Sequence, residues 1–108
     1  LRQQLARAHK RVAAGDAAGA LALLADATAP TPDDAVDLAY VRAFALAIEA
    51  SVARRQRRLP EGIELARTAL TALDSLDEAG RARADVAALR VKVNDALELL
   101  LEAHDARS

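Results

Sequence analysis

One segment of the sequence is apolar on nearly every side when it is drawn as a helix. Between Leu38 and Ala53, sixteen consecutive residues include only two charged side chains, Arg42 and Glu49. A helix of this kind must be covered by other protein on several sides. In a chain of 108 residues, the other segments or a second copy must provide that cover. The sequence therefore predicts a packed domain with this helix at its centre.

The composition favours an all-α fold. Hydrophobic residues make up 53% of the chain but aromatic residues only 2%, so Ala, Leu and Val must form the core. Ala and Leu have high helix propensities, and no segment shows the alternation that is typical of strands. We expect a single all-α domain over residues 1–108, built as a five-helix antiparallel array with short loops. The helices are predicted at about residues 1–14, 17–28, 33–58, 60–76 and 81–105.

The last predicted helix carries two apolar stripes. The first has the spacing of a coiled-coil seam and should face the core; it contains Val86, Leu89, Val93, Leu97 and Leu100. The second lies on the opposite side and consists of Ala84, Ala88, Val91 and Leu99. We expect the second stripe either to pack under the first two helices in a closed bundle or to stay open. If it is open, it would dock a partner helix or a second copy of the chain.

Small residues and turn residues recur along the two predicted hairpins. Those of the first hairpin match the small, turn, small, large, small and proline places of the tetratricopeptide pattern; they are Ala8, Gly15, Ala20, Leu24, Ala27 and Pro32. Those of the second hairpin are Ala50, Ala53, Gly62, Ala66 and Ala69. The chain therefore resembles the tetratricopeptide-repeat family, over about two and a half units.

The chain also departs from that family pattern. Gln4, Arg7 and Arg11 stand where the family has Trp, Leu and Tyr in its first helix. Ala20 and Gly62 are 42 residues apart, whereas the family repeat is about 34 residues long. A closed antiparallel helical bundle is the alternative architecture.

The resemblance implies a concave groove lined by the first helix of each hairpin. The residues that it places in this groove are Arg2, His9, Ser51, Arg54 and Arg55. Arginine is a fork-shaped donor to carboxylates, so such a groove would suit an acidic peptide. The arginines of residues 54–58 also suit the negative C-terminal end of the third predicted helix.

Several kinds of chemistry are not expected. The chain has no Cys, which excludes disulfides and Cys-ligated zinc. Asp95, Glu98 and Glu102 share one face, but no Glu-x-x-His or His-Glu-x-x-His sequence accompanies them, so we predict neither a metal site nor a cofactor. No nucleophile is paired with a base, so the chain is not expected to be an enzyme.

Nucleic acids and membranes are not expected as partners. The net charge is −1 and no aromatic residue is interleaved with the arginines, which argues against a nucleic-acid surface. The apolar segment of residues 38–53 is too short to span a membrane.

The sequence therefore predicts a cytoplasmic protein–protein interaction module. Its partner would be a peptide, a partner helix, or a second copy of the chain in a homodimer. A peptide that binds the basic groove would be acidic. One alternative is a dimerisation or docking domain of a larger enzyme or regulator, in which the last helix pairs with its symmetry mate. Another is a small-molecule regulatory domain with Tyr40 and Phe44 lining a pocket, although such a pair is more typical of a core.

Overall fold

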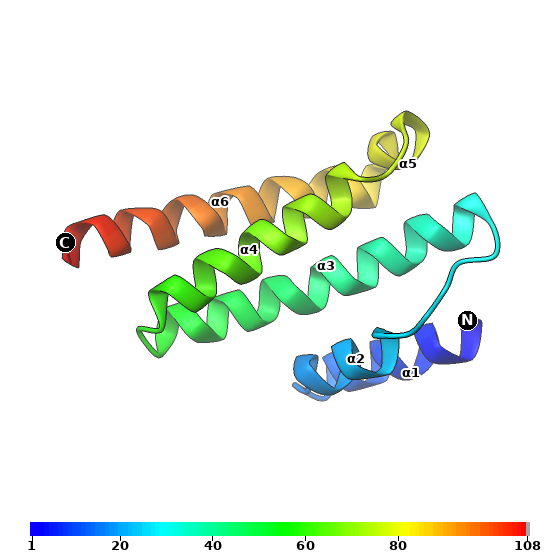
Figure 1. Cartoon of the computed structure of the whole chain (residues 1–108), viewed down its shortest axis with the longest axis horizontal. Helices are drawn as coiled ribbons and strands as arrows, with labels where there is room; N and C mark the ends of the chain where they lie inside the picture. The colour runs from blue at the N-terminus through cyan, green and yellow to red at the C-terminus, as the bar shows by residue number, and fades with distance from the viewer. Residues whose placement is uncertain (108) are drawn as a thin grey trace.

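The computed structural model describes residues 1–107 and confirms an all-α fold for this part of the chain (Figure 1). It contains six helices, with no strand among the described residues. The helices are α1 (Arg2–Ala13), α2 (Ala17–Leu24), α3 (Pro32–Arg55), α4 (Leu59–Asp74), α5 (Glu78–Ala82) and α6 (Ala84–Arg107).

The predicted number of five helices is wrong, because a further short helix, α5, begins between the helices predicted at residues 60–76 and 81–105. Asp77 accepts a hydrogen bond from the backbone N–H of Gly80 at 2.8 Å, and this cap begins the short helix α5. Arg83 then has extended backbone angles, φ −60° and ψ 132°, which end α5 and separate it from α6. The helix predicted at residues 81–105 therefore begins later, at Ala84, and the first residues of that range belong to α5.

Helix α2 ends at Leu24 rather than at Thr28 as predicted. The guanidinium of Arg42 in α3 donates hydrogen bonds to the carbonyl oxygens of Leu24 and Ala27. A cation is favourable at the negative end of a helix, where carbonyl groups lack partners within the helix. One of the two charges in the apolar segment therefore caps a neighbouring helix.

The helices pack in sequence order around α3. Helix α2 packs against both α1 and α3, and α4 packs against both α3 and α6, while α1 and α6 each also touch α3. In Figure 1 the α1–α2 hairpin lies at one edge of this array and α6 at the opposite edge, with α3 and α4 between them. The central position predicted for the apolar helix is confirmed.

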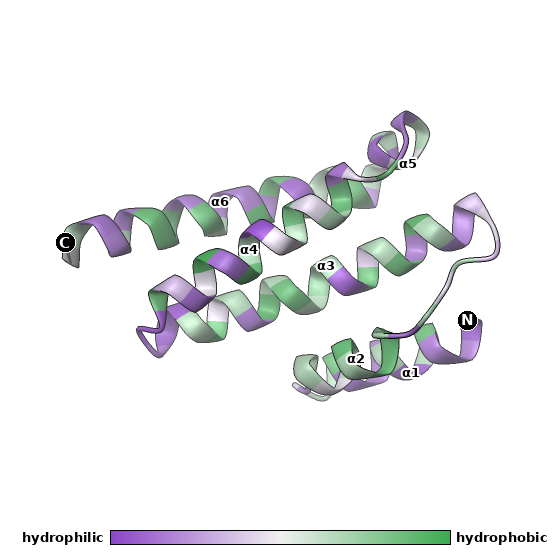
Figure 2. Cartoon of the chain, in the orientation of Figure 1, coloured by the Kyte–Doolittle hydropathy of each residue, from purple (hydrophilic) through white to green (hydrophobic). Residues whose placement is uncertain are grey.

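Two hydrophobic clusters lie on different sides of α3. One joins α1, α2 and α3, and its buried residues are Leu5, Ala8, Ala17, Ala20, Leu24, Leu38, Val41 and Ala45. The other joins α3, α4 and α6, and it includes the four members of the predicted core-facing stripe that are buried, Val86, Leu89, Val93 and Leu100. Figure 2 shows that hydrophobic residues dominate the middle of α3, as burial on two sides requires.

Small residues allow α4 to approach α3 closely. Ala50 and Ala53 of α3 and Ala66 of α4 are completely buried. A Cβ atom added to Gly62 of α4 would lie 3.4 Å from the carbonyl oxygen of Ala50 and from Cβ of Ala53 in α3. Small side chains therefore fill the contact between α3 and α4 at van der Waals distance.

We predict that Ala66→Leu lowers the free energy of unfolding by about 1–3 kcal/mol, because the added carbons overpack a closely packed helix contact. Chemical denaturation followed by circular dichroism measures this change. The matched control is Arg67→Leu on the exposed side of α4, which should change the stability little. Equal effects of the two substitutions would contradict the close packing.

Candidate functional site

Helices α3 and α6 leave a groove between them that no other helix fills. Its volume is about 390 Å³, and we call it the α3–α6 groove. The residues that line it are Phe44, Ala47, Ile48, Ser51, Arg55, Leu89, Lys92 and Ala96. The first five come from α3 and the last three from α6, so the groove follows directly from the spacing of these two helices.

The α3–α6 groove has an apolar wall and two cations. Phe44 is 38% exposed, which is unusual for an aromatic side chain in the middle of an apolar helix. Arg55 and Lys92 stand on opposite helices and form no ion pair within residues 1–107. The groove therefore offers hydrophobic contact together with unpaired positive charge.

The expectation that Tyr40 and Phe44 both belong to the core is wrong for Phe44. Tyr40 is half-buried and packs against both hydrophobic clusters. Its ring stacks on the ring of Phe44 at a centroid distance of 6.1 Å. Phe44 stays exposed because α1 and α6 flank α3 without covering the strip of its surface that lies between them.

A second hollow lies between α1 and α3, next to the start of α6. Its volume is about 400 Å³, and we call it the α1–α3 hollow. The residues that line it are Arg2, Leu5, Ala6, His9, Asp37, Tyr40, Val41, Arg83 and Asp85. Since Tyr40 lines this hollow and stacks on Phe44, the two aromatic rings connect the hollow with the α3–α6 groove.

An ion-pair network occupies the α1–α3 hollow. Asp37 of α3 accepts hydrogen bonds from Arg2 of α1 at 2.7 Å and from Arg83, which precedes α6, at 2.8 Å. Arg2 also pairs with Asp34, and Arg83 pairs with Asp85 at 2.7 Å. The network joins α1, α3 and α6, and it pairs both of its arginines with carboxylates.

The network also keeps its members charged. The hydrogen bonds from Arg2 and Arg83 hold the pKa of Asp37 below its usual value. The hydrogen bond from Arg83 likewise lowers the pKa of Asp85, and the pKa of Arg83 is raised by Asp85 and then by Asp37. These groups are therefore ionised at neutral pH and are already paired with one another.

The structure does not bring the five predicted groove residues into one groove. Arg2 and His9 line the α1–α3 hollow, where Arg2 is engaged by two carboxylates. Ser51 and Arg55 line the α3–α6 groove. Arg54 lies at a third hollow of about 210 Å³, whose lining residues are Arg54, Arg55, Arg57 and Ala103. The prediction of a single basic groove is thus corrected, because these residues line separate hollows between α1 and α3, between α3 and α6, and at the end of α3.

The third hollow lies at the turn between α3 and α4. Arg57 has a positive φ of 62°, a conformation that usually requires glycine, and the N–H of Arg58 bonds to the carbonyl of Ala53 at 2.8 Å. This turn closes α3 and gathers the guanidinium groups of Arg54, Arg55 and Arg57 at one end of the α3–α6 groove. The three arginines form no ion pair within the part of the chain that is described.

Sequence reasoning missed Phe44 and Lys92 as groove residues. Lys92 lies on α6 between the buried stripe and the exposed stripe, which is the position from which a side chain reaches a neighbouring helix. The packing of α6 beside α3 identifies Lys92 as a groove residue, but the sequence alone does not show which helices are neighbours.

The second stripe of α6 is open. Its members Ala84, Ala88, Val91 and Leu99 are all exposed, with exposed fractions of 60% for Val91 and 48% for Leu99. The alternative in which this stripe packs under α1 and α2 is therefore wrong.

Comparison with known proteins gives no match: no family model, curated protein or solved structure matches the chain. In residues 1–107, no helix combines the length and the hydropathy that crossing a membrane requires.

We predict that Asp37→Asn lowers the free energy of unfolding at pH 7 by up to about 1 kcal/mol, as expected for partly exposed ion pairs. Because the pKa of Asp37 is lower in the folded state, its contribution is present above the unfolded pKa of about 4 and is lost as the pH falls through the folded pKa. The stability difference between the two proteins should therefore shrink below about pH 4.

Denaturation at a series of pH values measures this difference. Asp26→Asn is the control, because Asp26 is exposed and forms no ion pair with any of the described residues. A difference that persists unchanged at low pH would show that the ion pairs are not its cause.

Proposed function

We propose that this protein is an interaction module whose α3–α6 groove binds a short acidic and apolar segment of a protein partner. The observation that carries this proposal is the exposed ring of Phe44 in a groove that is also lined by Arg55 and Lys92, two cations without an ion pair in residues 1–107. Aromatic side chains that become buried on binding are frequent hot spots of protein interfaces. The position of Phe44 supports that role.

The charges of the groove favour a carboxylate-bearing segment. Arg55 lines both the α3–α6 groove and the hollow that contains Arg54 and Arg57. A guanidinium group binds a carboxylate through two parallel hydrogen bonds. With a net charge of only −1 for the whole chain, this attraction is local and would mainly orient the partner.

The shape of the groove favours a helix or an extended peptide as the ligand. The groove runs between two helices, which is the arrangement that accepts an amphipathic helix by its apolar face. A suitable segment would place one or two apolar side chains against Phe44 and Leu89 and an acidic side chain beside Arg55 or Lys92.

We also propose that the helix array is tetratricopeptide-like. Helices α1, α3 and α6 would be the first helices of successive units, and α2 and α4 would be the second helices of the first two. The packing of α2 against α1 and α3, and of α4 against α3 and α6, supports this assignment. So does the fact that α1, α3 and α6 supply most of the residues around the groove and the α1–α3 hollow.

Binding of a peptide is favoured over catalysis and over binding of a small molecule. Ser51 is the only hydroxyl that lines the α3–α6 groove, and no described histidine or carboxylate lines it as a base. The small-molecule alternative needs Tyr40 and Phe44 in one pocket, but they line different hollows. We therefore propose that the protein is not an enzyme.

The proposal predicts which peptides the protein selects from a random peptide library. The selected peptides should combine apolar residues with Asp or Glu. Fluorescence anisotropy of one such labelled peptide should show an affinity at least about 10-fold lower for Phe44→Ala, because truncation removes the central contact. Arg55→Glu should weaken the same peptide, because it places a carboxylate where the peptide's own carboxylate binds.

Arg67→Glu is the matched control, since Arg67 is an exposed arginine on α4 that does not line the groove and has no ion pair in the described part of the chain. It changes the net charge by the same amount as Arg55→Glu and should leave the affinity nearly unchanged. Peptides that bind Phe44→Ala and the unmodified protein equally well would overturn the proposed groove.

A further inference from the structure

The two outer edges of the helix array carry opposite charges. In Figure 1 the α1–α2 hairpin forms one edge and α6 forms the other. Each edge combines apolar surface with charged groups that have no partner within the described chain.

The α6 edge is acidic and apolar. Its exposed stripe, which we call the acidic stripe, contains Val91, Asp95, Glu98, Leu99 and Glu102. These positions fall within about 100° of the helix circumference at 3.6 residues per turn. The three carboxylates form no ion pair in residues 1–107. Val91 and Leu99 are the two most exposed large apolar side chains of the described chain.

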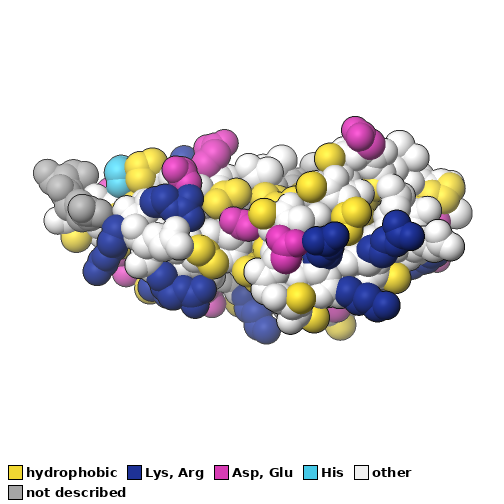
Figure 3. Space-filling view, turned by 90° about the horizontal axis from the view of Figure 1, so that it is seen from below, with side chains coloured by type: hydrophobic (Ala, Val, Ile, Leu, Met, Phe, Trp, Pro, Cys, Tyr) yellow, Lys and Arg dark blue, Asp and Glu magenta, His cyan; other side chains and the backbone are white. Residues whose placement is uncertain are grey.

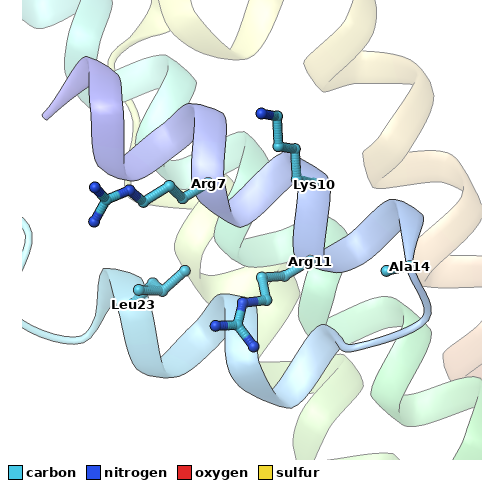
Figure 4. A pocket seen from close by; sticks show the side chains of 5 residues that line it. All are labelled: Arg7, Lys10, Arg11, Ala14 and Leu23. Atoms are coloured by element: carbon cyan, nitrogen blue, oxygen red, sulfur yellow. The ribbon is translucent and has the colours of Figure 1, made fainter.

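The α1–α2 edge is basic and hollowed. A cavity of about 390 Å³ lies between the two helices, and we call it the basic hollow. Figure 4 shows its lining residues Arg7, Lys10, Arg11, Ala14 and Leu23, with Leu23 facing α1 from α2. Arg11 pairs with Asp16 at 3.1 Å, whereas Arg7 and Lys10 have no ion-pair partner among residues 1–107. Seen from below, this side of the molecule displays several Lys and Arg side chains and fewer acidic ones (Figure 3).

We propose that copies of this chain bind one another head to tail, with the acidic stripe of one copy on the basic hollow of the next. Leu99 would contact the apolar surface of Leu23, and the carboxylates that flank Leu99 would pair with Arg7 and Lys10. The contact would thus bury an exposed leucine and pair charges that are unpaired in the single chain.

The charges favour this contact over a symmetric pairing of two α6 helices. A two-fold pair would place one acidic stripe against another. Asp95 lies midway between Val91 and Leu99 in the sequence, so an antiparallel pair centred on these apolar residues would bring Asp95 next to its own symmetry mate. Like charges in an interface cost free energy, and the basic hollow offers the complementary surface.

This association goes beyond the proposed peptide binding, and none of the residues named for the two edges is a lining residue of the α3–α6 groove. Because the two edges are different surfaces, each bound copy still has one open edge. Such a heterologous contact adds copies in a row rather than stopping at a dimer, unless its geometry closes a ring. One helix face and one hollow make a small contact, so we expect weak association that is strongest at low salt.

Sedimentation velocity over rising protein concentrations, up to about 1 mM at low salt because the contact is small, tests the proposal. The mass should rise past that of a dimer and should fall when salt is added. Leu99→Arg removes the acidic stripe as a binding surface, and the double variant Arg7→Glu with Lys10→Glu removes the basic hollow. Each variant alone should be a monomer, with its affinity for itself reduced at least about 10-fold.

A mixture of the two variants gives the sharpest result. The double variant keeps an intact acidic stripe and Leu99→Arg keeps an intact basic hollow, so the mixture should form a dimer and nothing larger. Glu98→Lys with Glu102→Lys serves as a second acidic-stripe variant should circular dichroism show that Leu99→Arg is unfolded. Arg67→Glu, outside both edges, should associate like the unmodified protein.

Three outcomes would overturn the proposal. The first is an unmodified protein that stays monomeric throughout the concentration range. The second is a dimer of the basic-hollow double variant, which would indicate symmetric α6 pairing instead. The third is a mixture of the two variants that contains only monomers. Binding of the selected peptide is measured separately, so the failure of either proposal leaves the other one testable.

Discussion

Both hydrophobic clusters of this protein depend on a single helix. Leu38 and Val41 of α3 face the α1–α2 hairpin, whereas Val36 and Ala43 belong to the cluster with α4 and α6. Burial of apolar surface is the dominant favourable term in folding, and α3 contributes a wall to each buried region. The remaining strip of α3 is not covered by a helix, and Phe44 is exposed there. The candidate groove is thus a consequence of how the central helix is covered.

Polar contacts orient the helices around this uncovered strip. Arg42 caps the end of α2 from within α3, and Asp37 connects Arg2 of α1 with Arg83 before α6. Ion pairs between partly exposed groups add little stability individually, but each fixes the position of one helix relative to another. Arg42 and Asp37 both project from α3, so the same helix that forms the core also positions its neighbours.

The sequence predicts those features that can be read from the side chains of one helix. The two stripes of α6 follow from its periodic pattern, and the central place of α3 follows from apolar residues on nearly all its sides. Helix α5 was missed because five residues are too few to show a period. The exposure of Phe44 was missed because an all-round apolar helix does not reveal which side lacks a neighbour. Contacts between segments that are far apart in the sequence cannot be read from a single sequence. The ion pairs of Arg2 and the position of Lys92 in the groove both depend on such contacts.

Because α3 belongs to both hydrophobic clusters, it also determines which parts of the native structure can unfold locally. The α1–α2 hairpin reaches the rest of the molecule mainly through α3, while α4 and α6 pack on another side of that helix. Detachment of the hairpin therefore exposes one side of α3 and leaves the cluster of α3, α4 and α6 assembled. Unfolding of α3, in contrast, disrupts both hydrophobic clusters. Local opening of this kind divides a small domain into cooperative units of unequal stability. The amide hydrogens of α1 and α2 should accordingly exchange with solvent through an opening of lower free energy than those in the middle of α3.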